Sequence, residues 1–358
     1  PVLAGPYRFE TFNPGLRNQA WLLRYTEGAE TPDTLVDPLQ WAADGSQSMA
    51  AWAPDSSGRW LAVAISDAGS DWRTIRIMDL STLQWLDEEI SQVKFSGVSW
   101  AGKGFFYSKF PQQSIDLTSQ NQGQQLRYHA IGTEVEKDPI VFEWPQNPRY
   151  GVYGYTTPDQ QWLIVSISPG TYGNMLKAVR LKDGIPVSDS FSILTREFDS
   201  ESSVVWHHNE RLYLYTNHEA PNRKLVRFKP GDQSRQWETI IPEHPEKVLQ
   251  NVKPWKKGWL VLYTHKVSSE LWYFRDGADP MPIELPYKGS ISGLSVKENH
   301  STAYFTLTTY AMPPTVFALN FGQRVPVAMH GSQKPGIGKD IEIRQEWMNA
   351  SDGERVPM

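Results

Sequence analysis

The residues able to do chemistry in this sequence are poorly spaced for catalysis. An α/β-hydrolase needs the nucleophile elbow Gly-x-Ser-x-Gly, because its serine must sit on a strained turn between a strand and a helix. The chain has none, and its nearest string, Gly97-Val98-Ser99-Trp100-Ala101, lacks the last glycine and lies in a strand-like run. We interpret Ser99 as a sheet residue. The absence of cysteine excludes thiol catalysis, disulfides and cysteine-bound metals.

Metal motifs are equally weak. Of the eight histidines, only His207, His208 and His218 are close in sequence, and adjacent residues of a strand point to opposite faces. We expect them to be solvent-exposed hairpin residues. The acidic run Asp87-Glu88-Glu89 is expected to face water in a loop between strands, and no His-Glu-x-x-His motif occurs. The sequence therefore predicts neither a metal site nor a cofactor.

The amino-acid composition indicates which class of fold would have to hold these candidate residues in place. The chain has 358 residues, 39% hydrophobic and 21% charged, with 26 glycines, 26 prolines and 12% aromatic residues. These values are typical of a globular, turn-rich all-β protein. A net charge of −5 argues against nucleic acid as a partner, and no apolar run is long enough to span a membrane. The first residues do not resemble a signal peptide, which favours the cytoplasm, with the periplasm as the alternative because the native N-terminus is not visible.

A short pattern of apolar and basic residues followed by a turn recurs along the whole chain. Its copies can be anchored 45 to 54 residues apart, at Trp21, Trp72, Leu126, Leu176, Leu225, Leu271 and Val316. A turn followed by an apolar, aromatic run precedes the pattern with the same period, for example from Ala53 and from Thr157. Such regular spacing is the signature of a repeat architecture.

Each repeat has room for about four short strands, and one such sheet cannot bury both of its faces. Seven sheets packed radially can, so the sequence predicts an all-β fold, a seven-bladed β-propeller of four-stranded antiparallel blades. A large sandwich or an irregular barrel is the alternative. We expect residues 1–345 to form the propeller and residues 346–358 to begin a strand leading toward a further domain.

Several strings resemble one propeller family specifically. They are FNPGLRNQ from Phe12, DAGSDWRTIRIM from Asp67, VKFSGVSW from Val93, YSKFPQQ from Tyr107 and RYHAIGT from Arg127. In order and spacing they are similar to the propeller of the prolyl oligopeptidase family. The ending MNASDGERVPM resembles the segment that leads from that propeller into the hydrolase domain.

The resemblance implies that catalysis and substrate access belong to two different domains. In this family a seven-bladed propeller covers an α/β-hydrolase domain, whose Ser-Asp-His triad cleaves short peptides after proline. This chain, which lacks an elbow, would then be the non-catalytic part that gates access and lines part of the substrate pocket. Its implied partners are the hydrolase domain of the same parent chain and short proline-containing peptides.

Four residues are implied to touch the substrate or the domain interface. Asp71 matches an aspartate that pairs with a substrate-binding arginine of the hydrolase, and Phe95 matches an aromatic residue of the pocket beyond proline. Gly151 and Thr171 match two further lining positions, where methionine and cysteine are common. If so, this pocket wall is wider and more polar than usual.

The stretch from Lys109 to Gln125 is rich in glutamine, serine and asparagine and cannot bury much apolar area. The resemblance places it at the domain interface. We therefore expect it to gate access, and its candidate residues are Pro111, Gln112, Gln113, Asn121 and Gly123.

Two other readings stay open. A stand-alone propeller would serve as a scaffold for protein interactions. A propeller enzyme with its own site in the central tunnel would need a cluster of histidines and carboxylates, whereas the repeats carry apolar and basic residues such as Arg24 and Arg127.

Overall fold

The computed structural model describes residues 1–15, 17–26, 29, 31–111, 121–231, 236–329, 341 and 344–357. Within these ranges the chain is almost entirely β-strand, with two single-turn 3-10 helices, η1 (Pro38–Gln40) and η2 (Val135–Lys137). No helix there is long and apolar enough to cross a membrane. The chain divides into two compact units, one of residues 4–218 and 226–239, the other of residues 1–3, 219–225 and 240–358.

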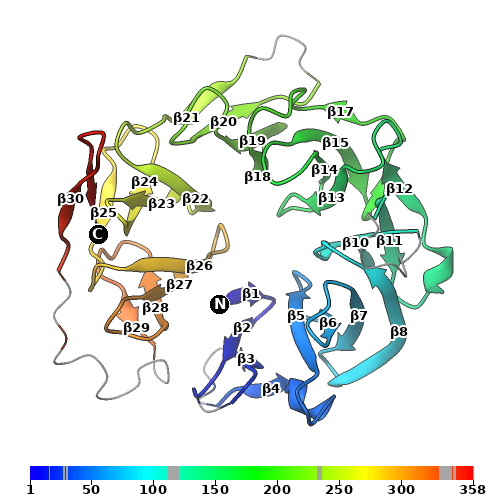
Figure 1. The fold of residues 1–358 in the computed structure, drawn as a ribbon. Helices are drawn as coiled ribbons and strands as arrows, with labels where there is room; N and C mark the ends of the chain where they lie inside the picture. Colours follow the sequence, from blue (N-terminus) through cyan, green and yellow to red (C-terminus); the bar gives the residue numbers. More distant parts are fainter. Residues whose placement is uncertain are drawn as a thin grey trace. The chain divides into compact units, whose positions relative to one another are not determined.

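The first two sheets follow the chain order (Figure 1). The first has four strands, β1 (Val2–Ala4), β2 (Tyr7–Phe12), β3 (Trp21–Thr26) and β4 (Asp33–Val36). The second has eight, β5 (Gln47–Pro54), β6 (Trp60–Asp67), β7 (Arg73–Asp79), β8 (Gln84–Val93), β9 (Ser99–Ala101), β10 (Gly104–Lys109), β11 (Gln125–Ala130) and β12 (Ile140–Glu143). Its halves are joined at β8 and β10 by one residue pair, Val93 with Lys109.

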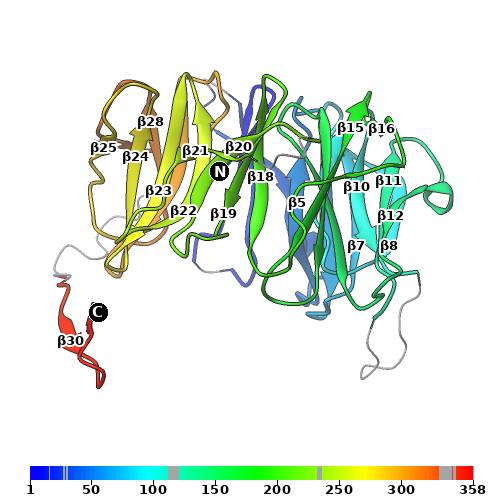
Figure 2. The same ribbon diagram turned by 90° about the horizontal axis from the view of Figure 1, so that it is seen from above.

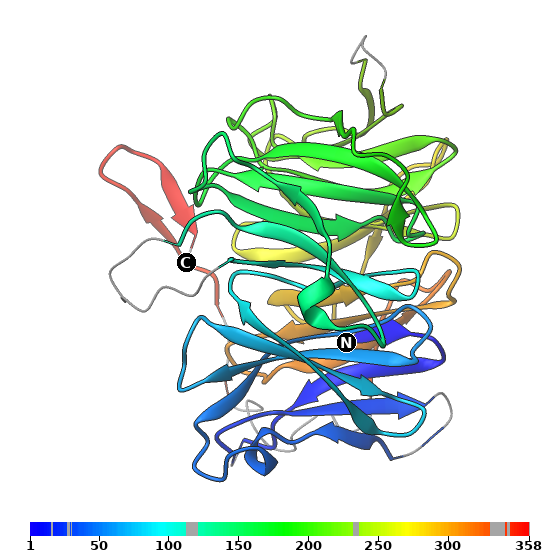
Figure 3. The ribbon, with the colours of Figure 1, turned by 90° about the vertical axis from the view of Figure 1, so that its right-hand side faces the viewer.

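The next two sheets are also built from strands that are consecutive in the chain. One contains β13 (Gly151–Thr156), β14 (Trp162–Ser168), β15 (Met175–Lys182), β16 (Ile185–Pro186) and β17 (Ser192–Ile193). The next contains β18 (Ser202–His208), β19 (Arg211–Thr216), β20 (Lys224–Phe228) and β21 (Glu238–Ile241). Figure 3 shows the twist of the cyan and green strands.

The remaining strands belong to the second unit. One four-stranded sheet contains β22 (Val248–Trp255), β23 (Gly258–His265), β24 (Ser268–Phe274) and β25 (Met281–Ile283). The other contains β26 (Ser290–Ser295), β27 (Thr302–Thr308), β28 (Thr315–Asn320) and β29 (Val327–Ala328). A separate hairpin, β30 (Trp347–Asn349) and β31 (Arg355–Pro357), lies beyond the end of β22–β25 (Figure 2).

The sheets of the larger unit stack because their second strands are apolar on both faces. In β6, Val63 packs with Phe9 of the preceding sheet, whereas its neighbour Ala62 packs with Phe105 of β10. The same alternation continues through β10 and β14. A buried side chain of this size contributes roughly 1.5–3 kcal/mol, so stacking stabilises sheets that could not stand alone. In the second unit, β23 packs on β27 in the same way.

The recurring sequence pattern corresponds to the third strand of each group of four. Its basic residues tie this strand to the fourth. The Arg24 guanidinium lies 2.7 Å from Asp33, and that of Arg76 lies 3.1 Å from Glu89. The prediction of strands repeating at a fixed period is therefore confirmed, and the repeated cations are structural.

Candidate functional site

The candidate residues lie at one end of the sheets of the larger unit. In antiparallel sheets built in chain order, the turn from second to third strand and the connection to the next sheet leave from the same end. Asp71 lies in the β6–β7 connection and Phe95 in the β8–β9 connection, and Pro111 and Gly123 lie near the two ends of the β10–β11 connection. Gly151 is the first residue of β13.

Asp71 and Phe95 are brought together by Lys94. The Lys94 Nζ lies 3.7 Å from Oδ2 of Asp71 and 5.0 Å from the centre of the Phe95 ring. It also lies 5.4 Å from the ring of Trp72, which meets Phe110 edge to face. The Asp71 side chain remains 63% exposed. The cluster therefore presents a carboxylate and an aromatic ring to solvent, and a carboxylate in this position can accept both arms of an arginine.

Phe95 has an unusual backbone. Its φ is +52°, in the left-handed region that bulky residues rarely adopt, and its side chain is 52% exposed. The loop is held by Ser96, whose Oγ accepts from the Ser108 N–H at 2.8 Å and donates to the Gly97 carbonyl at 2.7 Å. The Phe95 ring is not buried in the core, and glycine would adopt this backbone conformation more easily than phenylalanine. Residues in such strained conformations concentrate at functional sites.

Gln124 connects this loop to the next sheet. Its side chain is buried, donates to the Lys94 carbonyl at 3.1 Å and accepts from the Val152 N–H at 2.8 Å. The Gly123 N–H donates to the Pro148 carbonyl at 2.7 Å. The buried Gln124 amide thus fixes the Phe95 loop and the start of β13 to each other.

The surroundings of Gly151 are occupied. A Cβ placed on this residue would lie 2.4 Å from the hydroxyl oxygen of Tyr153 and 2.7 Å from its ring. Burial raises the pKa of the Tyr153 hydroxyl. Because the Tyr153 ring fills the space that a larger residue would take, Gly151 alone does not widen the surface here.

Comparisons with known proteins identify the family of this fold. Residues 1–326 match the family described as prolyl oligopeptidase, N-terminal beta-propeller domain. This chain belongs to the prolyl oligopeptidase family. The fold is accordingly a β-propeller with four-stranded antiparallel blades, as predicted, and the chain corresponds to the non-catalytic half of these peptidases.

Individual relatives of the prolyl oligopeptidase family cover the whole chain. It is 31% identical to a prolyl endopeptidase of Elizabethkingia meningoseptica, over 100% of this chain and 50% of that protein. A solved structure from a study of two prolyl endopeptidases matches with a TM-score of 0.87 at 28% identity, over 100% of this chain and 52% of that one. Prolyl oligopeptidase B from Galerina marginata, bound to a 25mer macrocyclization substrate, matches with a TM-score of 0.89 at 23% identity, covering 100% and 54%. The chain spans about half the length of the relatives it matches.

The other candidate positions are more dispersed. Thr171 is exposed in the β14–β15 connection, and among the described residues no hydrogen bond or ion pair joins it to Asp71 or Phe95. Pro111 and Gly123 approach each other, since a Cβ on Gly123 would lie 3.8 Å from Cγ of Pro111. Asn121, two residues before Gly123 in the chain, is partly buried. Gln112 and Gln113 lie outside the described residues.

Ser99 and the histidines have structural surroundings. Ser99 Oγ accepts from the Thr156 N–H at 2.9 Å, so this serine joins two strands. The expectation that His207 is exposed was wrong, because it is buried with Nδ1 2.6 Å from Asp159. His208 is exposed on the other face, stacked on Trp206. In the described part of the chain, no three or more histidines and carboxylates gather in a way that could hold a metal.

The structure contains a buried polar network around His129 that was not predicted from the sequence. His129 is fully buried, with Nδ1 3.0 Å from Asp138 and Nε2 3.5 Å from Glu88. Tyr107 donates to Asp138 at 2.8 Å. Burial alone would lower the pKa of His129, but the two carboxylates outweigh it and raise that pKa. The expectation that Glu88 faces water in a loop was wrong, because it lies in β8 and accepts from this network.

Proposed function

We propose that this chain acts within a longer polypeptide whose other half is an α/β-hydrolase domain that cleaves short peptides after proline. The relatives carry the name prolyl endopeptidase and are about twice as long. In this proposal the propeller supplies no catalytic group. It lines part of the peptide site and restricts entry to short peptides.

The exposed pair of Asp71 and Phe95 carries the proposal. Asp71 would pair with an arginine of the hydrolase domain that binds the peptide near proline, and a bidentate pair of this kind fixes the arginine in one orientation. Phe95 would offer its ring to the residue beyond proline. Pro111, Asn121 and Gly123, together with Gln112 and Gln113, belong to the segment proposed to gate entry, whereas Gly151 and Thr171 are proposed as outer lining positions.

The second unit has exposed residues of its own that we propose as contacts for the hydrolase domain. Tyr310 is 99% exposed in the β27–β28 connection, whose turn is closed by hydrogen bonds between Thr309 and Met312. Tyr287 and Val267 are exposed in connections at the same end of these sheets. Exposed aromatic residues on rigid turns are typical anchors of protein interfaces, which supports a hydrolase domain as the partner of this end.

We further propose seven blades, with residues 1–345 as the propeller and residues 346–358 as the start of the connection to the hydrolase. The single pair between Val93 and Lys109 supports dividing the eight-stranded sheet into two blades. The separate β30–β31 hairpin supports a boundary near residue 346. An experimental structure of the parent protein would test the count, and six or eight blades would contradict it.

Peptidase assays test the function itself. The parent polypeptide should cleave a short chromogenic peptide after proline and leave the same sequence intact within a folded protein. This chain alone should cleave neither. Turnover by the isolated chain, or a parent indifferent to proline, would contradict the proposal.

A further inference from the structure

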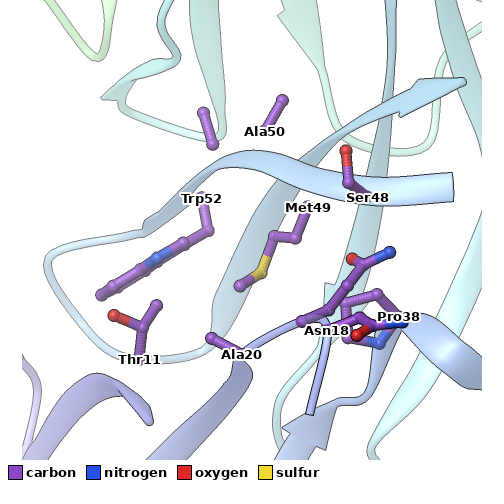
Figure 4. A pocket seen from close by; sticks show the side chains of 10 residues that line it. Thr11, Asn18, Ala20, Pro38, Ser48, Met49, Ala50 and Trp52 are labelled. Carbon is purple, nitrogen blue, oxygen red and sulfur yellow. The ribbon is translucent and has the colours of Figure 1, made fainter. Parts of the chain in front are cut away.

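A hollow of about 750 Å³ lies between the first sheet and β5 (Figure 4). Trp52, Met49 and Thr11 lie toward one side of it, and Asn18, Ser48 and Pro38 toward the other. The space would accommodate a few residues of an extended peptide. None of the residues discussed so far as substrate contacts lines it.

The walls of this hollow are held in place before any ligand arrives. The Gln19 amide donates to the carbonyls of Gly45 at 3.1 Å and Gln47 at 2.7 Å. The Arg17 guanidinium donates to both oxygens of Asp37, at 3.0 and 2.9 Å. A wall fixed in this way loses little conformational entropy when a ligand binds.

The rim of the hollow is continuous with the loop that carries Asp71. The Ser46 carbonyl accepts from the Ala68 N–H at 2.7 Å, and the Gln47 amide donates to Asp67 at 2.7 Å. Asp71 follows in the same connection. These two hydrogen bonds therefore join the start of β5, which borders the hollow, to the connection that carries Asp71.

The chemistry of the lining selects the ligand. All of its residues are uncharged, and they combine the Trp52 ring and the Met49 thioether with amide and hydroxyl groups. Among the described strands β5 pairs with β6 alone, and its register shifts between Met49 and Ala51, so that Ala50 falls outside the regular ladder. An extended peptide can bond to backbone groups at such an edge and place side chains in adjoining pockets.

We infer that this hollow is a remote subsite for an uncharged, extended stretch of the peptide substrate, with one apolar side chain directed at Trp52 and Met49. The inference rests on the proposed function, since it extends the same peptide site. The subsite would be a second point of contact with the substrate, away from the bond that is cleaved. It would favour peptides that carry an apolar extension.

Alkylation of a single cysteine tests the subsite. The chain has no cysteine, so Ala50→Cys gives it one thiol at an exposed position in the hollow. A peptide of alanine and proline with one leucine should slow iodoacetamide labelling about tenfold at a concentration ten times its Kd. The same peptide with glutamate in place of leucine should give little protection. Ala278→Cys, in an exposed turn of β24–β25, is the control and should label equally with and without peptide.

The parent enzyme gives an independent readout. Ala50→Glu places a charge in the hollow, and KM should rise several-fold for a leucine-extended peptide while the shortest chromogenic substrate is unaffected. Ala278→Glu should change neither. Unaltered labelling of Ala50→Cys, or an equal effect on both substrates, would overturn the subsite. A parent without activity after proline would instead refute the proposed function, whereas the labelling result would still report on the hollow.

Discussion

The ammonium group of Lys94 lies 3.7 Å from the carboxylate of Asp71, which still has most of its side chain in solvent. An ion pair of this length at a surface stabilises a protein little. Lys94 itself is largely covered and lies over the Trp72 and Phe95 rings. The pair therefore leaves the Asp71 carboxylate available to a stronger partner, while Lys94 fixes the aromatic residues beside it.

Replacing Phe95 should separate function from stability. Its ring is half exposed and its φ is positive, so Phe95→Gly removes little buried area and relieves the backbone. We expect the Tm of the 358-residue chain to stay constant or rise, while KM of the parent for peptides with a residue beyond proline increases. A large fall in Tm would show instead that the ring has a structural role.

Gln124→Ala should destabilise the chain. It leaves the Lys94 carbonyl and the Val152 N–H without their partner, and an unsatisfied buried group costs about 1–3 kcal/mol. Urea denaturation should show a lower midpoint than for the wild type. Gln122→Ala, at an exposed position nearby, is the matched control, and an equal midpoint for the two variants would refute the bridging role of Gln124.

The close approach of Tyr153 to Gly151 predicts a coupled pair. Gly151→Ala should be destabilising because the new Cβ overlaps the Tyr153 hydroxyl. When Tyr153 is already alanine, the further change Gly151→Ala should lower the free energy of unfolding much less than it does in the wild type. A double-mutant cycle of unfolding free energies measures this coupling, and strictly additive effects would contradict it.

The His129 network predicts a pH-dependent stability. Because Asp138 and Glu88 raise the pKa of His129 in the folded state, the protonated form is stabilised by folding. This contribution is complete below the ordinary histidine pKa of about 6.5 and is lost as the pH rises through the folded value. The stability difference between wild type and His129→Gln should therefore be larger at about pH 6 than at about pH 8.

The exposed His208→Gln variant is the control for this effect. It removes an exposed histidine without touching Asp138, Glu88 or Tyr107. A stability difference for His129→Gln that does not vary with pH would show that His129 acts only by packing.

The sequence predicted the strands well because each carries its own signal. The alternation in β6 places Val63 and Ala62 on opposite, equally apolar faces, and this pattern is local. The exposed pair of Asp71 and Phe95 was reached through family resemblance, and Lys94 was missed although it adjoins Phe95 in sequence. The lysine that directly precedes Phe95 in the sequence was the available signal.

Contacts that depend on how sheets pack were beyond sequence reasoning. Gln124 joins Lys94 to Val152, and His129 joins Glu88 to Asp138, across separations set by strand register. His207 was expected in solvent because nothing nearby in sequence indicates its partner, Asp159. Such pairings become visible only once the strands are in place.

The most direct test of the account is the activity of the parent enzyme with Asp71→Asn. This change keeps the shape of the side chain and removes the charge that would hold an arginine of the hydrolase domain. kcat/KM for a short proline-containing peptide should fall roughly 30-fold, equivalent to about 2 kcal/mol. Asp279→Asn, in an exposed turn of β24–β25, should have no effect. A kcat/KM for Asp71→Asn within about twofold of the wild type would contradict the claim that this end of the propeller completes the peptide site.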